Sequence, residues 1–94
     1  MKVNEMQKFS TYIDHMCHAI GFEPEKTRKN QRVHEYYRNY FCAGEKDKET
    51  WEELAQMEYA EKESNHIVDK YYYVTQKGLD FLSTIYKIGF KSMR

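Results

Sequence analysis

Several features are rare or absent in this chain, and their scarcity excludes some classes of protein. It contains one proline, four glycines, no internal repeat and no low-complexity stretch in 94 residues. With an aromatic content of 16%, this composition argues against disorder over most of its length. No apolar run approaches the roughly 20 residues of a membrane-spanning helix, and the first residues lack the apolar core of a signal peptide. We expect one domain covering residues 1–94.

Motifs of catalysis and cofactor binding are also missing. Cys17 and Cys42 form no CxxC pair, and we expect both to be reduced in the cytosol, buried among apolar neighbours and inert. The chain has no Gly-x-Ser-x-Gly, glycine-rich phosphate loop or His-Glu-x-x-His. Asp14, His15 and His18 lie close in sequence, but no four ligands converge as a zinc site requires. We therefore predict no enzyme, no metal site and no cofactor.

The first strong pattern predicts a helix from about Asn4, a suitable N-cap, to Ile20. Its apolar residues fall within an arc of roughly 100° on the helix surface: Met6, Phe9, Ile13, Met16, Cys17 and Ile20. Gly21 fits the left-handed position that ends a helix, and Phe22 is placed to pack back onto its last turn.

Three further helices and a hairpin are expected after a charged loop. A second helix covers residues 31–42, and a short third helix is capped by Asp47 or Thr50, with Trp51 and Leu54 facing inward. Residues 59–62 and 67–74 form the strands of a hairpin that turns near Ser64-Asn65. Thr75 caps a last helix that runs to Ile88 and stops at Gly89.

This order of elements predicts an α+β, winged-helix-like fold: three helices, a two-stranded β-hairpin (the wing) and a C-terminal helix. The residues Trp51-x-x-Leu54 and Tyr72-Tyr73-Val74-Thr75-x-Lys77-Gly78-Leu79 resemble the wing and following helix of many bacterial winged-helix regulators. We expect Thr75 to cap that helix and Gly78 to let its first turn lie close to the sheet.

A broader resemblance is to small proteins from phages and prophages of Gram-positive bacteria. The segments that carry it are Ala19-Ile20-Gly21, Tyr37-Arg38-Asn39-Tyr40-Phe41, Trp51-Glu52-Glu53-Leu54 and Tyr72-Tyr73-Val74-Thr75-Gln76-Lys77-Gly78. The resemblance is one of style and size and implies no activity. We expect an accessory protein of the host cytosol that binds a macromolecule, such as a host nucleic-acid enzyme or a defence protein that it inhibits.

The expected recognition helix and the rising strand of the wing are acidic. Residues 45–63 contain eight acids and three lysines, a charge of −5. DNA-reading helices carry Arg, Lys, Asn or Gln instead, and phosphates repel carboxylates. We predict that this segment binds a protein, or is only a solvated face; its candidate residues are Glu49, Glu52, Glu53, Glu58, Glu61 and Glu63.

Two alternatives remain open from the sequence. A DNA-binding regulator would use a basic segment whose tyrosine neighbours lie in the predicted second helix: Lys26, Arg28, Lys29, Arg32 and Arg38. The apolar residues of the last helix cover an arc of about 180°, wider than one core-facing helix needs. That helix therefore either packs on the first helix or forms a homodimer seam through Phe81, Ile85, Ile88 and Phe90.

Overall fold

The computed structural model describes residues 3–63 and 71–93 as an α+β arrangement of three α-helices, a short 3₁₀ helix and five strands. The elements are α1 (Val3–Ala19), η1 (Pro24–Lys26), β1 (Val33–Tyr36), β2 (Phe41–Cys42), α2 (Glu45–Gln56), β3 (Ala60–Lys62), β4 (Tyr71–Val74), α3 (Gln76–Tyr86) and β5 (Gly89–Ser92).

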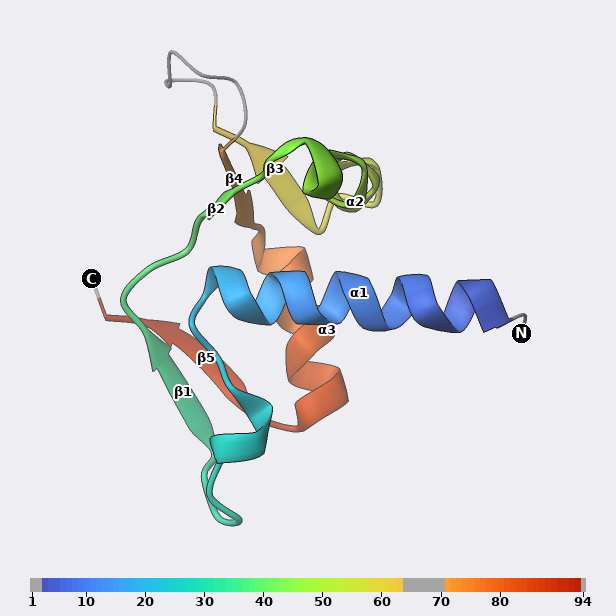
Figure 1. The fold of residues 1–94 in the computed structure, drawn as a ribbon. Helices are drawn as coiled ribbons and strands as arrows, with labels where there is room; N and C mark the ends of the chain where they lie inside the picture. Colours follow the sequence, from blue (N-terminus) through green and yellow to red (C-terminus); the bar gives the residue numbers. More distant parts are fainter. Residues whose placement is uncertain (1–2, 64–70, 94) are drawn as a thin grey trace.

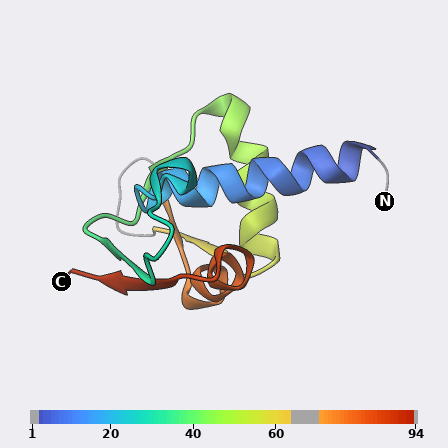
Figure 2. The same cartoon turned by 90° about the horizontal axis from the view of Figure 1, so that it is seen from below.

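The elements form two groups on either side of α1 (Figure 1). At one end, α2 lies beside an antiparallel sheet of order β2-β4-β3. At the other end, β1 pairs with β5 in a two-stranded parallel sheet, with η1 close by. The view from below shows β5 leading away from the end of α3, to the side of the helices (Figure 2). Among the described residues, no helix is both long and apolar enough to cross a membrane.

One core joins the two groups. Its largest fully buried side chains come from α1 and the residue that follows it, α2, β4 and α3: Trp51, Tyr72, Met16, Ile20, Leu54, Leu82 and Val74. The Trp51 ring stacks between Phe41 and Tyr72, with ring centroids 5.1 and 5.7 Å apart. The predicted inward positions Trp51 and Leu54 are therefore confirmed.

The predicted first helix and its ending are confirmed. The helix begins at Val3, ahead of the cap predicted at Asn4, and Gly21 takes φ +65°. The amide of Gly21 donates to the carbonyl of His18, and that of Phe22 to the carbonyl of Cys17. These two bonds form a Schellman motif, which turns the buried Phe22 back onto the helix.

The helix predicted over residues 31–42 is wrong. Val33–Tyr36 alternates exposed and half-buried positions as β1, and Phe41–Cys42 forms β2. Between them, the Asn39 side chain donates to the carbonyl of Val74 and accepts from its amide, both at 2.8 Å. Strand pairings with distant residues thus replace the local helix. The chain consequently lacks, within its described part, the helix that the winged-helix order places before a recognition helix.

Two other boundaries differ from prediction. Helix α2 begins after Gly44, with no side-chain cap, so Asp47 and Thr50 lie within the helix. Helix α3 ends at Tyr86 because Lys87 adopts a left-handed conformation at φ 56°. Ile88 then turns into the core, and Gly89 begins β5 instead of ending a helix.

The hairpin and the entry to α3 follow the prediction. Strands β3 and β4 pair antiparallel, with Ala60 opposite Val74. The turn predicted near Ser64-Asn65 lies outside the described residues, as do positions 67–70 of the second strand. The Thr75 side chain accepts from the amide of Gly78 at 3.2 Å, which confirms the predicted cap.

Gly78 also confirms the predicted close approach of the helix to the sheet. A Cβ built there would overlap the Tyr59 carbonyl oxygen and lie 2.7 Å from Val74 Cγ1. Only glycine fits this contact without displacing backbone.

We predict that Gly78→Ala lowers the free energy of unfolding by about 2 kcal/mol or more, because the added methyl group overpacks a backbone contact. Urea denaturation measures this. Gly89→Ala is the matched control: its Cβ would meet only ordinary contacts at 3.7 and 3.9 Å, so we expect a change within about 0.5 kcal/mol. Equal effects of the two variants would contradict the prediction.

Candidate functional site

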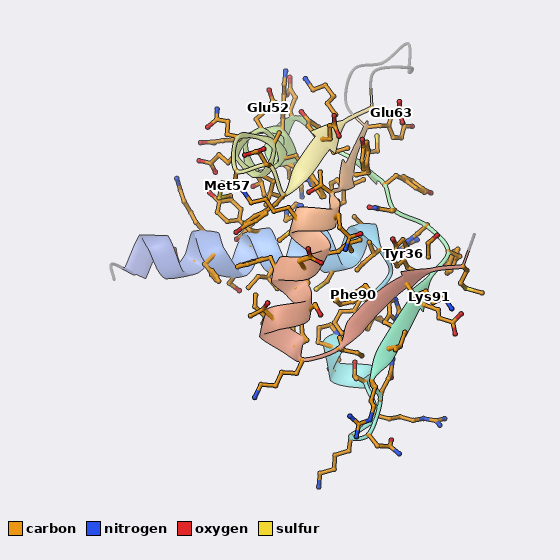
Figure 3. All side chains as sticks on the ribbon, turned by 180° about the vertical axis from the view of Figure 1, so that it is seen from behind. Tyr36, Glu52, Met57, Glu63, Phe90 and Lys91 are labelled. Carbon is orange, nitrogen blue, oxygen red and sulfur yellow. The ribbon has the colours of Figure 1, made fainter. Side chains whose placement is uncertain are left out.

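The six predicted acidic residues lie on α2, on β3 and on the turns that flank β3. We call these residues, Glu49, Glu52, Glu53, Glu58, Glu61 and Glu63, the acidic face. Glu49, Glu58 and Glu61 are exposed, and the other three are partly buried. Figure 3 shows Glu52 and Glu63 at the end of the molecule away from Phe90 and Lys91. The fold therefore gathers the acidic residues at one end.

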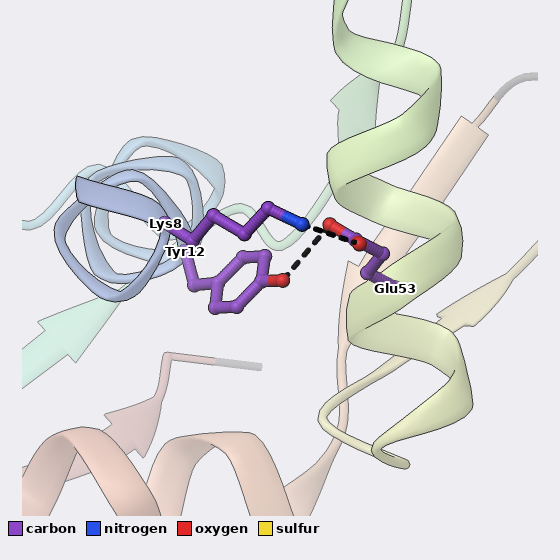
Figure 4. A network of polar contacts seen from close by, with 3 residues as sticks. All are labelled: Lys8, Tyr12 and Glu53. Atoms are coloured by element: carbon purple, nitrogen blue, oxygen red, sulfur yellow. Dashed lines mark hydrogen bonds and ion pairs between the residues drawn. The ribbon is translucent and has the colours of Figure 1, made fainter. Parts of the chain in front are cut away.

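Three tyrosines donate hydrogen bonds to carboxylates of this face. Tyr12 on α1 bonds Glu53 at 2.8 Å, and Tyr72 and Tyr73 on β4 bond Glu52 and Glu61, each at 2.6 Å. Lys8 also reaches Glu53 at 3.4 Å, as the close view shows (Figure 4). No local pattern predicts the bonds of Tyr12 and Tyr72, because their partners lie on α2. The pair of Tyr73 and Glu61 instead lies across the predicted β3–β4 hairpin.

The pKa of three of the bonded groups is shifted. The bond from Tyr72 lowers the pKa of Glu52. Burial, followed by the bond to Glu53, raises the pKa of Tyr12 to about 12. The bond to Glu61 also raises the pKa of Tyr73. A hydrogen bond from a neutral phenol to a carboxylate is charge-assisted, so each of the three bonds gives its carboxylate a fixed orientation.

Lysines offset part of the charge. Lys62 lies 3.7 Å from Glu52, and Lys77 lies 3.7 Å from Glu58. Both pairs are largely solvated, and such pairs contribute little to stability. With Lys8 and Lys77 added to the segment 45–63, eight carboxylates stand against five lysines. The acidic face remains negative.

Helices α1 and α2 form a groove of about 310 Å³ beside this face. It is lined by Gln7, Lys8, Thr11, Tyr12, Glu49, Thr50 and Glu53. Glu49 and Glu53 lie one helical turn apart on α2, so both carboxylates border the same depression. The groove therefore combines an aromatic ring, hydroxyl groups, two acids and Lys8, which pairs with Glu53.

The basic residues predicted for DNA binding divide into two sets. Arg28, Lys29 and Arg32 are exposed in the loop between η1 and β1, at the opposite end of the molecule from α2 (Figure 1). Lys26 pairs with Glu23 at 3.2 Å. Arg38 turns inward, where its Nη2 donates to the His18 carbonyl at the end of α1. It therefore supports the fold and does not extend the exposed basic loop.

The predicted dimer seam is largely used within the chain. Ile88 is 3% exposed, and Phe90 packs on Phe22 with ring centroids 5.1 Å apart. Phe81 stacks on Tyr59 at 4.8 Å. Ile85 alone among the four is exposed, at 37%. The seam stays a prediction, and three of its members already have apolar contacts in one copy.

The two cysteines are free, but their surroundings differ. Cys17 is buried, and burial raises its pKa to about 11, which leaves an unreactive thiol. Cys42 is exposed on β2, so the expectation that it is buried is wrong. No group of three or more His, Cys, Asp or Glu side chains that could hold a metal gathers within residues 3–63 and 71–93.

His15 joins α1 to α2. Its Nδ1 accepts a hydrogen bond from Trp51 Nε1 at 3.1 Å, and its Nε2 lies 3.8 Å from Asp47. Burial lowers the pKa of this imidazole below 6.5, although Asp47 acts in the opposite sense. The neutral ring is therefore the form that accepts from Trp51.

Comparisons of the chain with known protein families, with curated proteins and with solved structures gave no match.

The His15 contact predicts acid sensitivity. Unfolding frees His15 to take up a proton near pH 6.5, whereas the folded state resists protonation. We expect its contribution to the free energy of unfolding to be complete above pH 6.5 and to decline as the pH falls below that value. Urea denaturation between pH 7.5 and 5 checks this.

His15→Asn keeps an acceptor for Trp51 but does not titrate. We therefore expect a shallower decline for this variant than for the parent protein. Ser10→Asn, at an exposed position of the same helix, is the control, because it introduces the same side chain without removing a titratable group. A parental slope in the His15 variant would show that another group carries the effect.

Proposed function

We propose that this protein is a small non-enzymatic binding module whose acidic face engages a basic surface of a protein partner. Its resemblance to phage and prophage proteins favours an accessory role in the host cytosol. The partner in that setting would be a nucleic-acid enzyme whose cationic, DNA-binding groove accepts carboxylates in place of phosphates. The winged-helix resemblance of residues 51–79 belongs to the same proposal and adds no function by itself.

The observation that carries the proposal is the set of three tyrosine–glutamate hydrogen bonds. Tyr12, Tyr72 and Tyr73 come from elements packed on the core, so they fix their carboxylates relative to one another. A charge that is already oriented loses less side-chain entropy on binding than a freely rotating one. An acidic helix whose carboxylates contact only solvent has no such tyrosine–glutamate hydrogen bonds.

The separation of charge supports the same conclusion. The exposed Arg28, Lys29 and Arg32 lie at the far end of the molecule from α2 (Figure 1). They therefore leave the field of the acidic face largely uncancelled, since ions screen charges beyond about 10 Å. Such a field steers a basic partner toward one end of the molecule.

The groove between α1 and α2 offers a specific contact for that partner. An arginine or lysine side chain entering it would place its methylene groups against Tyr12 and its charge beside the exposed Glu49, because Lys8 and Tyr12 already bond Glu53. The groove thus adds apolar contact to charge attraction, which a flat acidic surface does not supply.

DNA binding through the basic loop is the second candidate. The pairing of β1 with β5 favours it, because Gly89 donates to the Arg32 carbonyl and so brings exposed Lys87 and Lys91 to the same end as Arg32. Docking of α2 in a DNA groove is disfavoured, since its carboxylates would face phosphates.

Binding to an oligo-arginine peptide tests the acidic face. We expect titration calorimetry to detect binding by the parent protein, with affinity falling as salt rises. Glu49→Lys weakens it by about tenfold or more, because both the charge and the groove change. Glu25→Lys makes the same change of charge on η1 and alters affinity less than about threefold. Equal losses would mean that only net charge matters.

Removal of one supporting hydroxyl tests orientation separately from charge. Tyr73→Phe keeps every carboxylate and removes the bond to Glu61. We expect the affinity for the same peptide to fall about fivefold, which corresponds to roughly 1 kcal/mol of hydrogen bonding. Tyr37→Phe, at a residue 67% exposed and away from the acidic face, leaves affinity unchanged. A Tyr73→Phe variant with the parental affinity for the peptide would show that the orientation of the carboxylates does not contribute to binding.

A salt-titrated assay with duplex DNA tests the second candidate. DNA binding that weakens with salt and disappears in the triple variant Arg28→Glu, Lys29→Glu and Arg32→Glu would favour the regulator. The binding-module proposal expects no measurable DNA affinity at physiological salt.

A further inference from the structure

The sheet formed by β1 and β5 has one covered face and one open face. On the covered face, the ring centroids of Phe90 and His34 lie 5.1 and 5.0 Å from that of Phe22. The open face carries the alternate residues of both strands: Val33, Glu35, Gly89, Lys91 and Met93. Figure 3 shows Phe90 on the side of α3 and Lys91 on the opposite side of β5.

An open face is unusual for a parallel sheet. Parallel strands occur almost only where both faces are covered, and two strands alone have little independent stability. Here Val33 is 49% exposed and Met93 is 61% exposed, so two of the five large hydrophobic side chains exposed in the described chain lie on this one face. The face therefore has the composition of a surface that another layer covers.

The charges on this face are complementary to those on the same face of a second copy. Glu35 on β1 lies in register with Lys91 on β5, and both side chains are exposed. Rotation by 180° about an axis that runs along the strands, between β1 and β5, exchanges the two strand positions. A second copy related by this axis would place its Lys91 over Glu35 of the first copy, and its Glu35 over Lys91.

We propose that the open face of the β1–β5 sheet binds a second copy of this chain, with the two-fold axis parallel to the strands. This symmetry joins opposite charges twice and places Val33 over Gly89 of the second copy, where no side chain stands in the way. An axis running across the strands would instead place Glu35 over Glu35 and Lys91 over Lys91. Like-charge repulsion disfavours that arrangement.

The small area of this face predicts a weak dimer. Four residues of strand extend about 13 Å, and the two strands present far less than the roughly 800 Å² that each partner buries in a stable complex. We expect dissociation in the range of about 0.1–1 mM, where exposed charge pairs decide the arrangement and apolar contacts supply most of the attraction. The surface is distinct from the acidic face and from the predicted seam, whose Ile88 and Phe90 point into the core.

Sedimentation equilibrium of the full chain over a range of concentrations tests the proposal. The parent protein shows a monomer–dimer equilibrium. Glu35→Lys and Lys91→Glu each raise the dissociation constant about tenfold, because each homodimer now has two like-charge contacts. Val33→Asp, at a half-exposed position, also prevents the dimer. Glu25→Lys, with the same charge change as Glu35→Lys but on η1, leaves it intact. Circular dichroism confirms that every variant is folded.

Mixing the two charge variants provides the decisive control. In a heterodimer of Glu35→Lys with Lys91→Glu, both contacts again join opposite charges, although each chain keeps its own unfavourable neighbour pair. Recovery of dimer in the equimolar mixture therefore supports contact between chains. A parent protein that stays monomeric to about 1 mM, charge variants that dimerise as the parent does, or a mixture without recovery would overturn the proposal. So would a dimer that only Ile85→Asp disrupts, since that assigns it to α3.

Discussion

Two strands from distant parts of the sequence, Val33–Tyr36 and Gly89–Ser92, pair in parallel, and much of the structure depends on this pairing. Because of this pairing, α3 leads past α1 from the antiparallel sheet at one end of the molecule to β5 at the other (Figure 1). The pairing also holds Val33–Tyr36 as a strand where the sequence predicted a helix. The exposed basic loop before β1 is consequently held far from α2, and Lys87 and Lys91 lie at the same end of the molecule as this loop.

The tyrosines connect core packing to surface charge. Tyr72 stacks on Trp51 in the interior, and its hydroxyl reaches Glu52 at the surface. Such a residue has an apolar body and a polar end, so one side chain serves both environments. The positions of the carboxylates thus depend on how α2 and β4 pack on α1. A change in the core would therefore alter the acidic face, even where no charge is touched.

The two proposed surfaces make different physical demands. The acidic face attracts a partner by an uncancelled field and receives it with carboxylates that are already oriented. The open face of the β1–β5 sheet relies on apolar contact, with two charge pairs selecting the symmetry. Because these surfaces lie at opposite ends of the molecule, a dimer through the second would leave both acidic faces accessible. Such a dimer would present two copies of the binding surface to one partner.

The amino-acid sequence by itself determined the elements that depend on neighbours along the chain. The apolar stripe of α1 with its Gly21 ending, the inward Trp51 and Leu54 of α2, the β3–β4 hairpin and the Thr75 cap all follow from local spacing and backbone preference. The acidic composition of residues 45–63 was equally plain. Each of these features places its interacting residues within a few turns or one hairpin, so a short window contains the whole signal.

Only the tertiary structure decided the rest. Val33–Tyr36 and Phe41–Cys42 contain aromatic residues at spacings that also suit a helix, and their strand partners Gly89–Ser92 and Tyr71–Val74 lie far along the chain. The position of Arg38, the burial of Ile88 and the bonds of Tyr12 and Tyr72 to glutamates of α2 were decided in the same way. The physical reason is common to all of them: their stabilising contacts form between segments that only the folded chain brings together, so no local pattern records them.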